Sequence, residues 1–232
     1  MATIKVMSGG APKEVFGVLT PAFETQSGHK VSYSFAVLSA LRDRLAAGEA
    51  ADVLVMPTNI LDAYEKSGVV RSDGRAVLGL VSVNAVVRAG AAKPDLSSVE
   101  AVKHAMLAAR NIVFATPGMT PSGTHMGKLV ETLGLAAAMK GRIIHRPALE
   151  GGVELVAGGE AELGFWPKSE VIGAKGLALV GPLPAEIQLT TIYGAAVTSA
   201  SPAPDAGAAF VAFMRDPVHR AVWDRGGFDK PA

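Results

Sequence analysis

The sequence contains no cysteine, no long apolar run and no excess of one charge. Without cysteine, the 232-residue chain can form neither disulfides nor thiolate metal sites. Its apolar runs are far shorter than the ~20 residues that a membrane-spanning helix needs. A formal net charge of +1 gives no support for nucleic acid or an acidic surface as a partner. With 49% hydrophobic residues, the chain can instead bury the cores of one large domain or of two lobes.

Sequence signatures of common cofactor and catalytic sites are also missing. The glycine pairs at 9–10 and 151–152 do not form GxGxxG, and no GxxxxGK[ST] occurs, so we do not expect a nucleotide enzyme. No paired carboxylates indicate a hydrolase. Four histidines have no metal-like spacing among themselves and are interpreted as solvent-facing: His29, His104, His145 and His219. We therefore expect no cofactor and no metal.

The start of the chain shows no signal-peptide pattern. A strand is expected at residues 4–7, with neither a basic segment nor an apolar h-region before it. Two interpretations follow from this pattern. The protein is periplasmic if a signal has been removed from this chain, and cytoplasmic otherwise.

Strand, loop and helix recur three times in the first seventy residues. Strands are expected at residues 4–7, 30–35 and 51–56, and helices at 13–27, 40–47 and 57–66. This order predicts an α/β fold with a parallel sheet and crossover helices. Such sheets bind ligands at the carboxyl ends of their strands. The loops at these ends supply the candidate ligand-binding residues Ser8, Gly9, Gly10, Leu38, Ser39, Pro57 and Thr58.

The segment NIVFATPGMTPSGTHMGKLVETLG, residues 111–134, reads as a strand, a ligand loop and a helix. Ser122 is a good N-cap residue, and Gly123, Thr124 and His125 would form the first helical turn. Free backbone N–H groups and the positive end of the helix dipole attract anions at such a turn. The hydroxyls of Ser122, Thr124 and Thr120 would add donors. We therefore expect an anion site here.

His125 has three interpretations: a ligand donor, a proton shuttle or a helix residue packed beside Leu129. The helix dipole disfavours imidazolium in the first turn, so a neutral ring able to give or take a proton is expected there. Ser8 either cradles an anion or belongs to an ordinary turn. No GxSxG surrounds it, which argues against a nucleophile.

The second half of the chain predicts a second lobe. Two long apolar strands, at residues 78–88 and 188–197, would cross between lobes, which gives residues 1–82 with 195–232 as lobe I and 83–194 as lobe II. A helix at 150–157, entered through Gly151 and Gly152, would donate backbone N–H groups. Trp166, at the end of a strand over 162–166, would line a cleft or pack in the core. Lys168, in the expected loop 167–170, would neutralise a carboxylate or lie on the surface.

Several ordered stretches together resemble the molybdate-binding-protein-like branch of the type II periplasmic solute-binding proteins, which also includes aconitate isomerase. They are IKVMSGGAPKEVF, SFAVLSALRDRLAAGEAADVLVMP, TPSGTHMGKLVETLGL, EGGVELVAGGEAELGFWPKSEV and AAFVAFMRDPVHRAVWDRGGF. The resemblance covers nearly the whole chain. It implies two α/β lobes, each a mainly parallel sheet flanked by helices, with a small anion held in a cleft between them. It also implies an ABC transporter permease as a partner of a monomeric protein that does not span the membrane.

The ligand positions depart from the molybdate pattern. Leu38 stands where the resemblance places a serine hydroxyl, and Trp166 stands in the run where a tyrosine is usual. A bulkier, partly apolar site with Lys168 and His125 suits an organic carboxylate better than molybdate or tungstate. The leading hypothesis is therefore a carboxylate-binding protein that closes by a hinge motion. The alternative is an isomerase of an unsaturated di- or tricarboxylate, with His125 as the proton-transferring residue.

Overall fold

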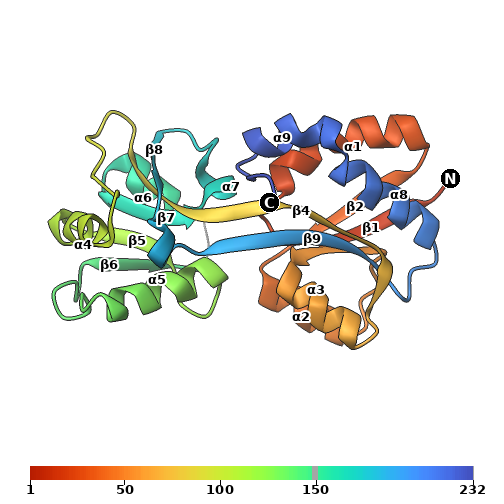
Figure 1. Cartoon of the computed structure of the whole chain (residues 1–232), viewed down its shortest axis with the longest axis horizontal. Helices are drawn as coiled ribbons and strands as arrows, with labels where there is room; N and C mark the ends of the chain where they lie inside the picture. The colour runs from red at the N-terminus through yellow and green to blue at the C-terminus, as the bar shows by residue number, and fades with distance from the viewer. Residues whose placement is uncertain (148–150, 232) are drawn as a thin grey trace. The chain divides into compact units, whose positions relative to one another are not determined.

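A computed structural model describes residues 1–147 and 151–231 of the chain. Strand and helix alternate from the N-terminus (Figure 1). The first three pairs are β1 (Thr3–Ser8) with α1 (Lys13–Ser27), β2 (Lys30–Phe35) with α2 (Leu38–Ala46), and β3 (Val53–Pro57) with α3 (Thr58–Lys66). The strands β2 and β3 both pair with β1 in parallel, as the repeating pattern predicts.

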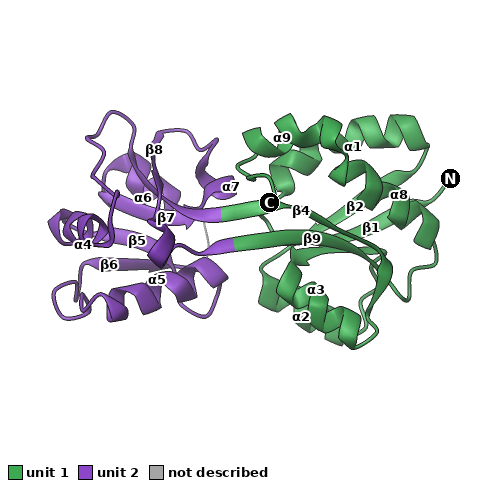
Figure 2. Cartoon of the chain, viewed as in Figure 1, with its two compact units in different colours: residues 1–81, 191–232 green, residues 82–190 purple. Residues whose placement is uncertain are grey.

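The chain divides into two compact units, residues 1–81 with 191–232 and residues 82–190 (Figure 2). It passes between them in β4 (Val70–Arg88) and at the start of β9 (Thr190–Thr198). Unit 1 also contains α8 (Pro204–Arg215), the 3-10 helix η2 (Pro217–His219) and α9 (Arg220–Arg225). Its strand order is β2-β1-β3-β9-β4, and β9 runs antiparallel to β3.

Unit 2 has a parallel core of three strands. They are β6 (Ile143–Arg146), β5 (Ile112–Ala115) and β7 (Leu163–Pro167), in that spatial order, with β4 antiparallel to β7. The strand β8 (Leu177–Pro182) pairs with the far half of β4. The helices are α4 (Val99–Ala108), α5 (Pro121–Thr132), α6 (Val153–Gly158) and α7 (Lys168–Val171), with the 3-10 helix η1 (Ala185–Ile187) before β9.

Each sheet is covered on both faces, because alternate strand residues point to opposite sides. In unit 1, Val53 and Val55 face α1, α8 and α9, whereas Leu54 faces α2 and α3. In unit 2, Ile112 and Phe114 of β5 pack with α4 and α5. Val113, between them, packs with residues of α6, α7 and β8. The near-continuous apolar runs of the strands therefore fill two cores in each unit.

Several expected elements need correction. The strand expected at residues 78–88 begins at Val70, and the loop expected at 167–170 forms the short helix α7. The strands β6 and β8 were not predicted at all. The N-terminal residue of the expected helix 150–157 lies outside the described residues. By contrast, α1 has the predicted bounds, and it ends at Gly28, whose left-handed backbone (φ 72°) satisfies the stop signal.

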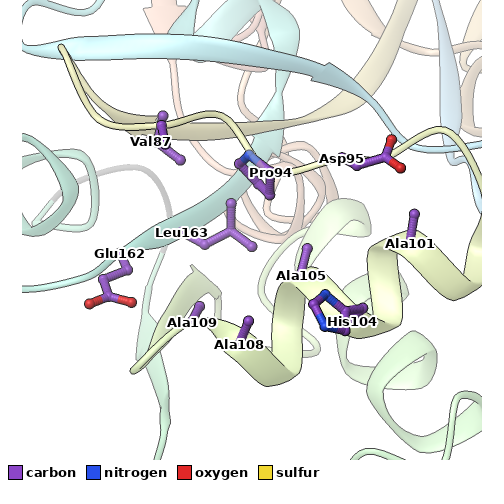
Figure 3. A pocket seen from close by; sticks show the side chains of 11 residues that line it. Val87, Pro94, Asp95, Ala101, His104, Ala105, Ala108, Ala109, Glu162 and Leu163 are labelled. Carbon is purple, nitrogen blue, oxygen red and sulfur yellow. The ribbon is translucent and has the colours of Figure 1, made fainter.

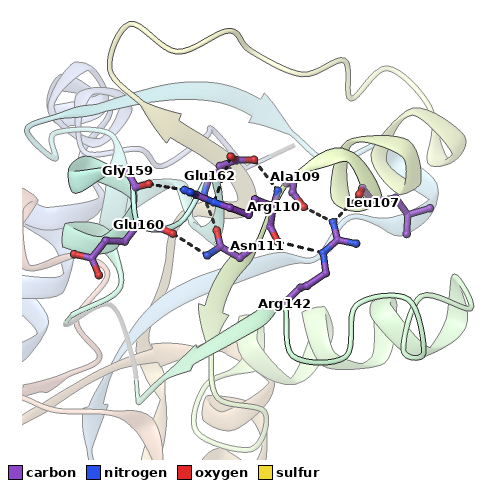
Figure 4. Close-up of polar contacts among 8 residues, drawn as sticks. All are labelled: Leu107, Ala109, Arg110, Asn111, Arg142, Gly159, Glu160 and Glu162. Carbon is purple, nitrogen blue, oxygen red and sulfur yellow. Dashed lines mark hydrogen bonds and ion pairs between the residues drawn. The ribbon is translucent and has the colours of Figure 1, made fainter.

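A network of hydrogen bonds connects the amino ends of the unit 2 strands with the end of α4 (Figure 4). Arg142 donates hydrogen bonds to the carbonyls of Leu107, Ala109 and Arg110 at the end of α4. Asn111, just before β5, accepts from the backbone N–H of Glu162 (3.1 Å) and donates to the carbonyl of Glu160 (2.8 Å). These bonds join the starts of β5 and β7 to the end of α4. The amino edge of this sheet thus holds structural contacts.

Candidate functional site

The candidate residues of unit 1 gather at one edge of its sheet. The strands β1, β2 and β3 run parallel, so Ser8, Phe35 and Pro57 end at the same side. Ser8 is fully buried, and its hydroxyl donates to the carbonyl of Gly9 (2.8 Å). Gly10 is exposed before α1. Leu38 and Thr58 are the first residues of α2 and α3, and Ser39 lies in the first turn of α2 rather than in a loop.

Tyr193 joins this edge, although the sequence analysis did not single it out. It lies opposite Pro57 in the antiparallel register of β3 and β9. A Cβ atom built on Gly9 would lie 3.4 Å from the Tyr193 hydroxyl oxygen and 3.3 Å from Leu38 Cδ2. Gly9, Leu38 and Tyr193 therefore meet at one point. The strand at 188–197 was expected, but no local pattern shows which strand it pairs with.

In unit 2, α5 starts directly over the end of β5. A Cβ on Gly123 would lie 2.4 Å from the backbone oxygen of Ala115, so only glycine permits this close approach. The helix N-cap is Thr120, not Ser122: the Thr120 hydroxyl accepts from the Gly123 N–H (3.0 Å). Pro121 occupies the first helical position, and Ser122 and Gly123 follow it in the first turn, so the helix begins two residues earlier than expected.

The N-cap at Thr120 leaves fewer free backbone N–H groups at the start of α5 than the sequence suggested. The Gly123 N–H is taken by Thr120, the Thr124 N–H by the Thr120 carbonyl (3.0 Å), and Pro121 has no N–H. The Ser122 hydroxyl is buried and shares a 3.1 Å hydrogen bond with the Thr120 hydroxyl. Within the described ranges, the Ser122 N–H has no acceptor outside its own helix. The donors of the helix start are thus centred on Ser122.

His125 is half-buried and lies in the second turn of α5. Its Nε2 atom lies 2.8 Å from the carbonyl oxygen of Ile187. A carbonyl can only accept, so Nε2 carries the proton and donates it. In the neutral ring, Nδ1 is then an acceptor. The His125 ring therefore does more than pack beside Leu129. Its Nε2 atom is held by the hydrogen bond to Ile187 of η1, and Nδ1 of the neutral ring can accept a hydrogen bond or a proton.

The remaining candidates of unit 2 lie at the ends of β6 and β7. Gly151 adopts a left-handed backbone (φ 73°), and Gly152 is buried as the N-cap of the six-residue helix α6. Trp166 is fully buried in the core between the sheet and α6 and α7, so its ring lines no surface. The expectation of a cleft wall fails for this side chain. Lys168 is half-buried at the start of α7.

Three polar groups near α7 stand out by their burial. Trp166 Nε1 and the Ser169 hydroxyl are buried and have no hydrogen-bond partner among the described residues. Glu170, the next residue, keeps part of its side chain exposed, but burial of the carboxyl group raises its pKa from 4.5 to about 7. No sequence pattern indicates these groups, because the burial of each depends on how α7 packs on β7.

The described residues also form a hollow of about 570 Å³ elsewhere in unit 2 (Figure 3). Alanine side chains of α4, together with Val87 and Leu163, make up much of its wall, and His104 and Glu162 stand at its margin. It lies by the amino end of β7, and none of the predicted site residues lines it. Among described residues there is no cluster of three or more metal-ligand side chains, and no helix is long and apolar enough to cross a membrane.

The fold and the residues at the strand ends define a solute-binding protein. The chain belongs to the bacterial extracellular solute-binding protein family, whose model matches residues 4–229. The expected two-lobe type II fold is confirmed by solved structures of the same class.

A curated relative is the aconitate isomerase of a Pseudomonas species, which is 32% identical over 241 residues, covering 100% of this chain and 90% of the relative. The substrate-binding domain of a putative molybdenum ABC transporter from Clostridium difficile superposes with a TM-score of 0.81 at 14% identity, over 100% of both chains. The periplasmic molybdate-binding protein of Azotobacter vinelandii gives a TM-score of 0.79 at 20% identity, over 99% of this chain and 100% of that one.

Proposed function

We propose that this protein binds a small organic carboxylate, in preference to molybdate or tungstate. The observation that carries the proposal is the chemistry of the strand ends. At the edge of unit 1, the half-buried Leu38 lies beside the buried residues Gly9 and Tyr193, so the side chains there are apolar and aromatic. A carbon skeleton gains from such contacts, whereas a hydrated oxyanion gains only from hydrogen bonds and charge.

The carboxylate group itself is assigned to the start of α5. The Ser122 N–H and hydroxyl lie at the positive end of this twelve-residue helix. His125 lies further along the helix; its Nε2–H donates to the Ile187 carbonyl, so the neutral ring keeps Nδ1 as an acceptor rather than as a donor to a carboxylate. In this proposal the ligand takes further contacts from the strand ends of unit 1, and the units close on it by bending in β4 and β9.

The family and its molybdate-binding members support anion binding in general. The carboxylate preference has separate support: the relative that covers this whole chain at 32% identity is named for aconitate, a tricarboxylate. Delivery of the bound ligand to a transporter is consistent with the family, and the partner would be an ABC transporter permease.

Isothermal titration calorimetry against molybdate, tungstate and a panel of di- and tricarboxylates tests the proposal. We expect heat of binding with at least one carboxylate and weaker or no binding of the metal oxyanions. Tight molybdate binding without a response to any carboxylate would contradict the preference. Silence toward every anion would contradict anion binding altogether.

A second candidate function is isomerisation of an unsaturated di- or tricarboxylate. Two observations favour it: the aconitate isomerase relative, and the His125 tautomer that leaves Nδ1 unprotonated. Moving a double bond requires removal of a proton from one carbon and delivery of a proton to another. A neutral histidine can accept a proton in the first step and return it in the second.

Proton NMR separates the two functions. Cis- and trans-aconitate are incubated with the protein in deuterated buffer, in parallel with His125→Ala. Interconversion of the two acids, or entry of deuterium at the methylene carbon, that disappears in His125→Ala would establish the isomerase. Ligand that binds but returns chemically and isotopically unchanged would establish the binder.

A further inference from the structure

A row of three residues crosses the carboxyl edge of unit 2. In the parallel register, Ala115 of β5 lies opposite Arg146 of β6. On its other side the pair Phe114 and Phe165 places Ala115 beside Trp166 of β7. Neighbouring strands are about 4.8 Å apart, so Arg146 and Trp166 flank the small alanine at roughly 10 Å between their Cα atoms.

All three side chains point to the same face of the sheet. Val113 of β5 and Ile144 of β6 both pack in the core beneath α6 and α7, and Ala115 and Arg146 follow them by two residues. Trp166 belongs to that same core. The buried Ala115 therefore stands between the guanidinium and the indole.

The Arg146 side chain is held in place but is not neutralised. Its Cδ and Nε atoms lie 3.5 Å from the position that a Cβ on Gly151 would take, and Nη1 donates to the His145 carbonyl (3.0 Å). No carboxylate of residues 1–147 and 151–231 forms an ion pair with it. Its backbone carbonyl accepts from the Thr116 N–H and hydroxyl, which fixes the end of β6 against the loop before α5.

A buried polar atom lies at the other end of the row. Among the described residues, Trp166 Nε1 has no acceptor. The six-membered part of the ring lies over Gly164, where a Cβ would be 2.1 Å from Cζ3, so Nε1 on the five-membered part is directed away from Gly164. Buried polar atoms in native proteins nearly always have a partner, and an enclosed water can supply it for a ring that is fully buried.

We propose that Arg146 binds a carboxylate of the ligand at this row. A half-buried guanidinium offers parallel N–H groups that match the two oxygens of a carboxylate, and it needs a counter-charge that the described chain does not supply. The start of α5 and Arg146 then recognise separate carboxylates, so the site selects di- and tricarboxylates over acids with one. This inference rests on the carboxylate-binding function proposed above and identifies the residue that sets its specificity.

The test is calorimetric titration of a tricarboxylate into wild type, Arg146→Gln, Arg146→Lys and, as a matched control, Lys140→Gln. Lys140 is exposed on the same unit and has no side-chain partner among those described, so this variant removes one positive charge away from the row. We expect Arg146→Gln to weaken binding about ten- to a hundredfold, Arg146→Lys to recover part of the loss, and Lys140→Gln to bind as wild type does. Circular dichroism melting confirms that each variant is folded.

Affinity in folded Arg146→Gln equal to that of wild type would overturn the inference while leaving the proposed function intact. An equal loss in Lys140→Gln would also overturn it, since the effect would then be one of net charge. Wild-type protein that binds no carboxylate would overturn both.

Discussion

Glu170 makes the folded state sensitive to pH. Burial raises the pKa of its carboxyl group from 4.5 to about 7. Between these two values the folded protein keeps a proton that the unfolded chain releases, so the contribution of Glu170 to stability falls as pH rises from about 4.5 to about 7. Above pH 7 the penalty of burying the charge is fully present.

Glu170→Gln removes this charge without changing the shape of the side chain. We expect its Tm to exceed that of wild type by about 2–5 °C at pH 8, with the difference shrinking as pH falls to 5. Scanning calorimetry at several pH values measures both curves. A Tm difference that does not change with pH would show that the carboxyl group titrates as an ordinary exposed one.

Gly123 is required by the contact between α5 and β5. Its Cβ would lie 2.4 Å from a backbone oxygen, and backbone atoms cannot move aside cheaply. We expect Gly123→Ala to lower the free energy of unfolding by about 2 kcal/mol or more. Gly17→Ala is the control, because Gly17 is exposed within α1 and has open space around it; there alanine should stabilise the helix by about 0.5–1 kcal/mol. Urea denaturation compares the two, and equal stabilities would contradict the packing described.

The elements show where local sequence signals suffice. The helix α1 has the predicted bounds because Gly28 supplies a local stop with a left-handed backbone. The start of α5 was misplaced because Thr120 and Ser122 are both good caps. The deciding signal was present: proline favours the first helical position, so Pro121 makes Thr120 the cap.

Pairing and burial could not be read from local patterns. Tyr193 reaches the candidate site only through the register of β9 with β3, and Arg146 only through β6, a four-residue strand without a distinct pattern. The sequence allowed two positions for the Trp166 side chain, a cleft wall or the core. The alternation of side chains along β7 places it in the core. The polar groups of α7 depend on tertiary packing in the same way. The strand-helix order could thus be predicted from the sequence better than the pairing and burial of the residues around the candidate site.

The cap at Thr120 gives a test at the scale of the helix. Thr120→Ala removes the acceptor of the Gly123 N–H and the partner of the Ser122 hydroxyl. We expect a loss of about 1 kcal/mol in the free energy of unfolding and weaker ligand binding, because the first turn carries the proposed anion donors. Thr132→Ala, at the other end of α5, removes only an exposed hydrogen bond to Lys128 and should leave binding unchanged. Equal ligand affinity in Thr120→Ala and Thr132→Ala would show that the first turn of α5 does not belong to the ligand site.

At the scale of the whole molecule, each unit has its own sheet, its own cores and its own carboxyl edge, and the chain passes between units only in β4 and at the start of β9. Each unit also places some of the predicted residues at that edge. This division leads to the central claim of the proposed function, that one carboxylate ligand takes contacts from the strand ends of both units.

The most direct test is titration of one tricarboxylate into wild type, Ser8→Ala and Ser122→Ala. Ser8 ends β1 in unit 1, and Ser122 lies in the first turn of α5 in unit 2. We predict one ligand per chain for wild type and an affinity about ten- to a hundredfold lower in each folded variant, because each loses one hydroxyl that can donate a hydrogen bond to a charged group. Wild-type affinity in either variant, or two ligands bound independently per chain, would contradict the claim.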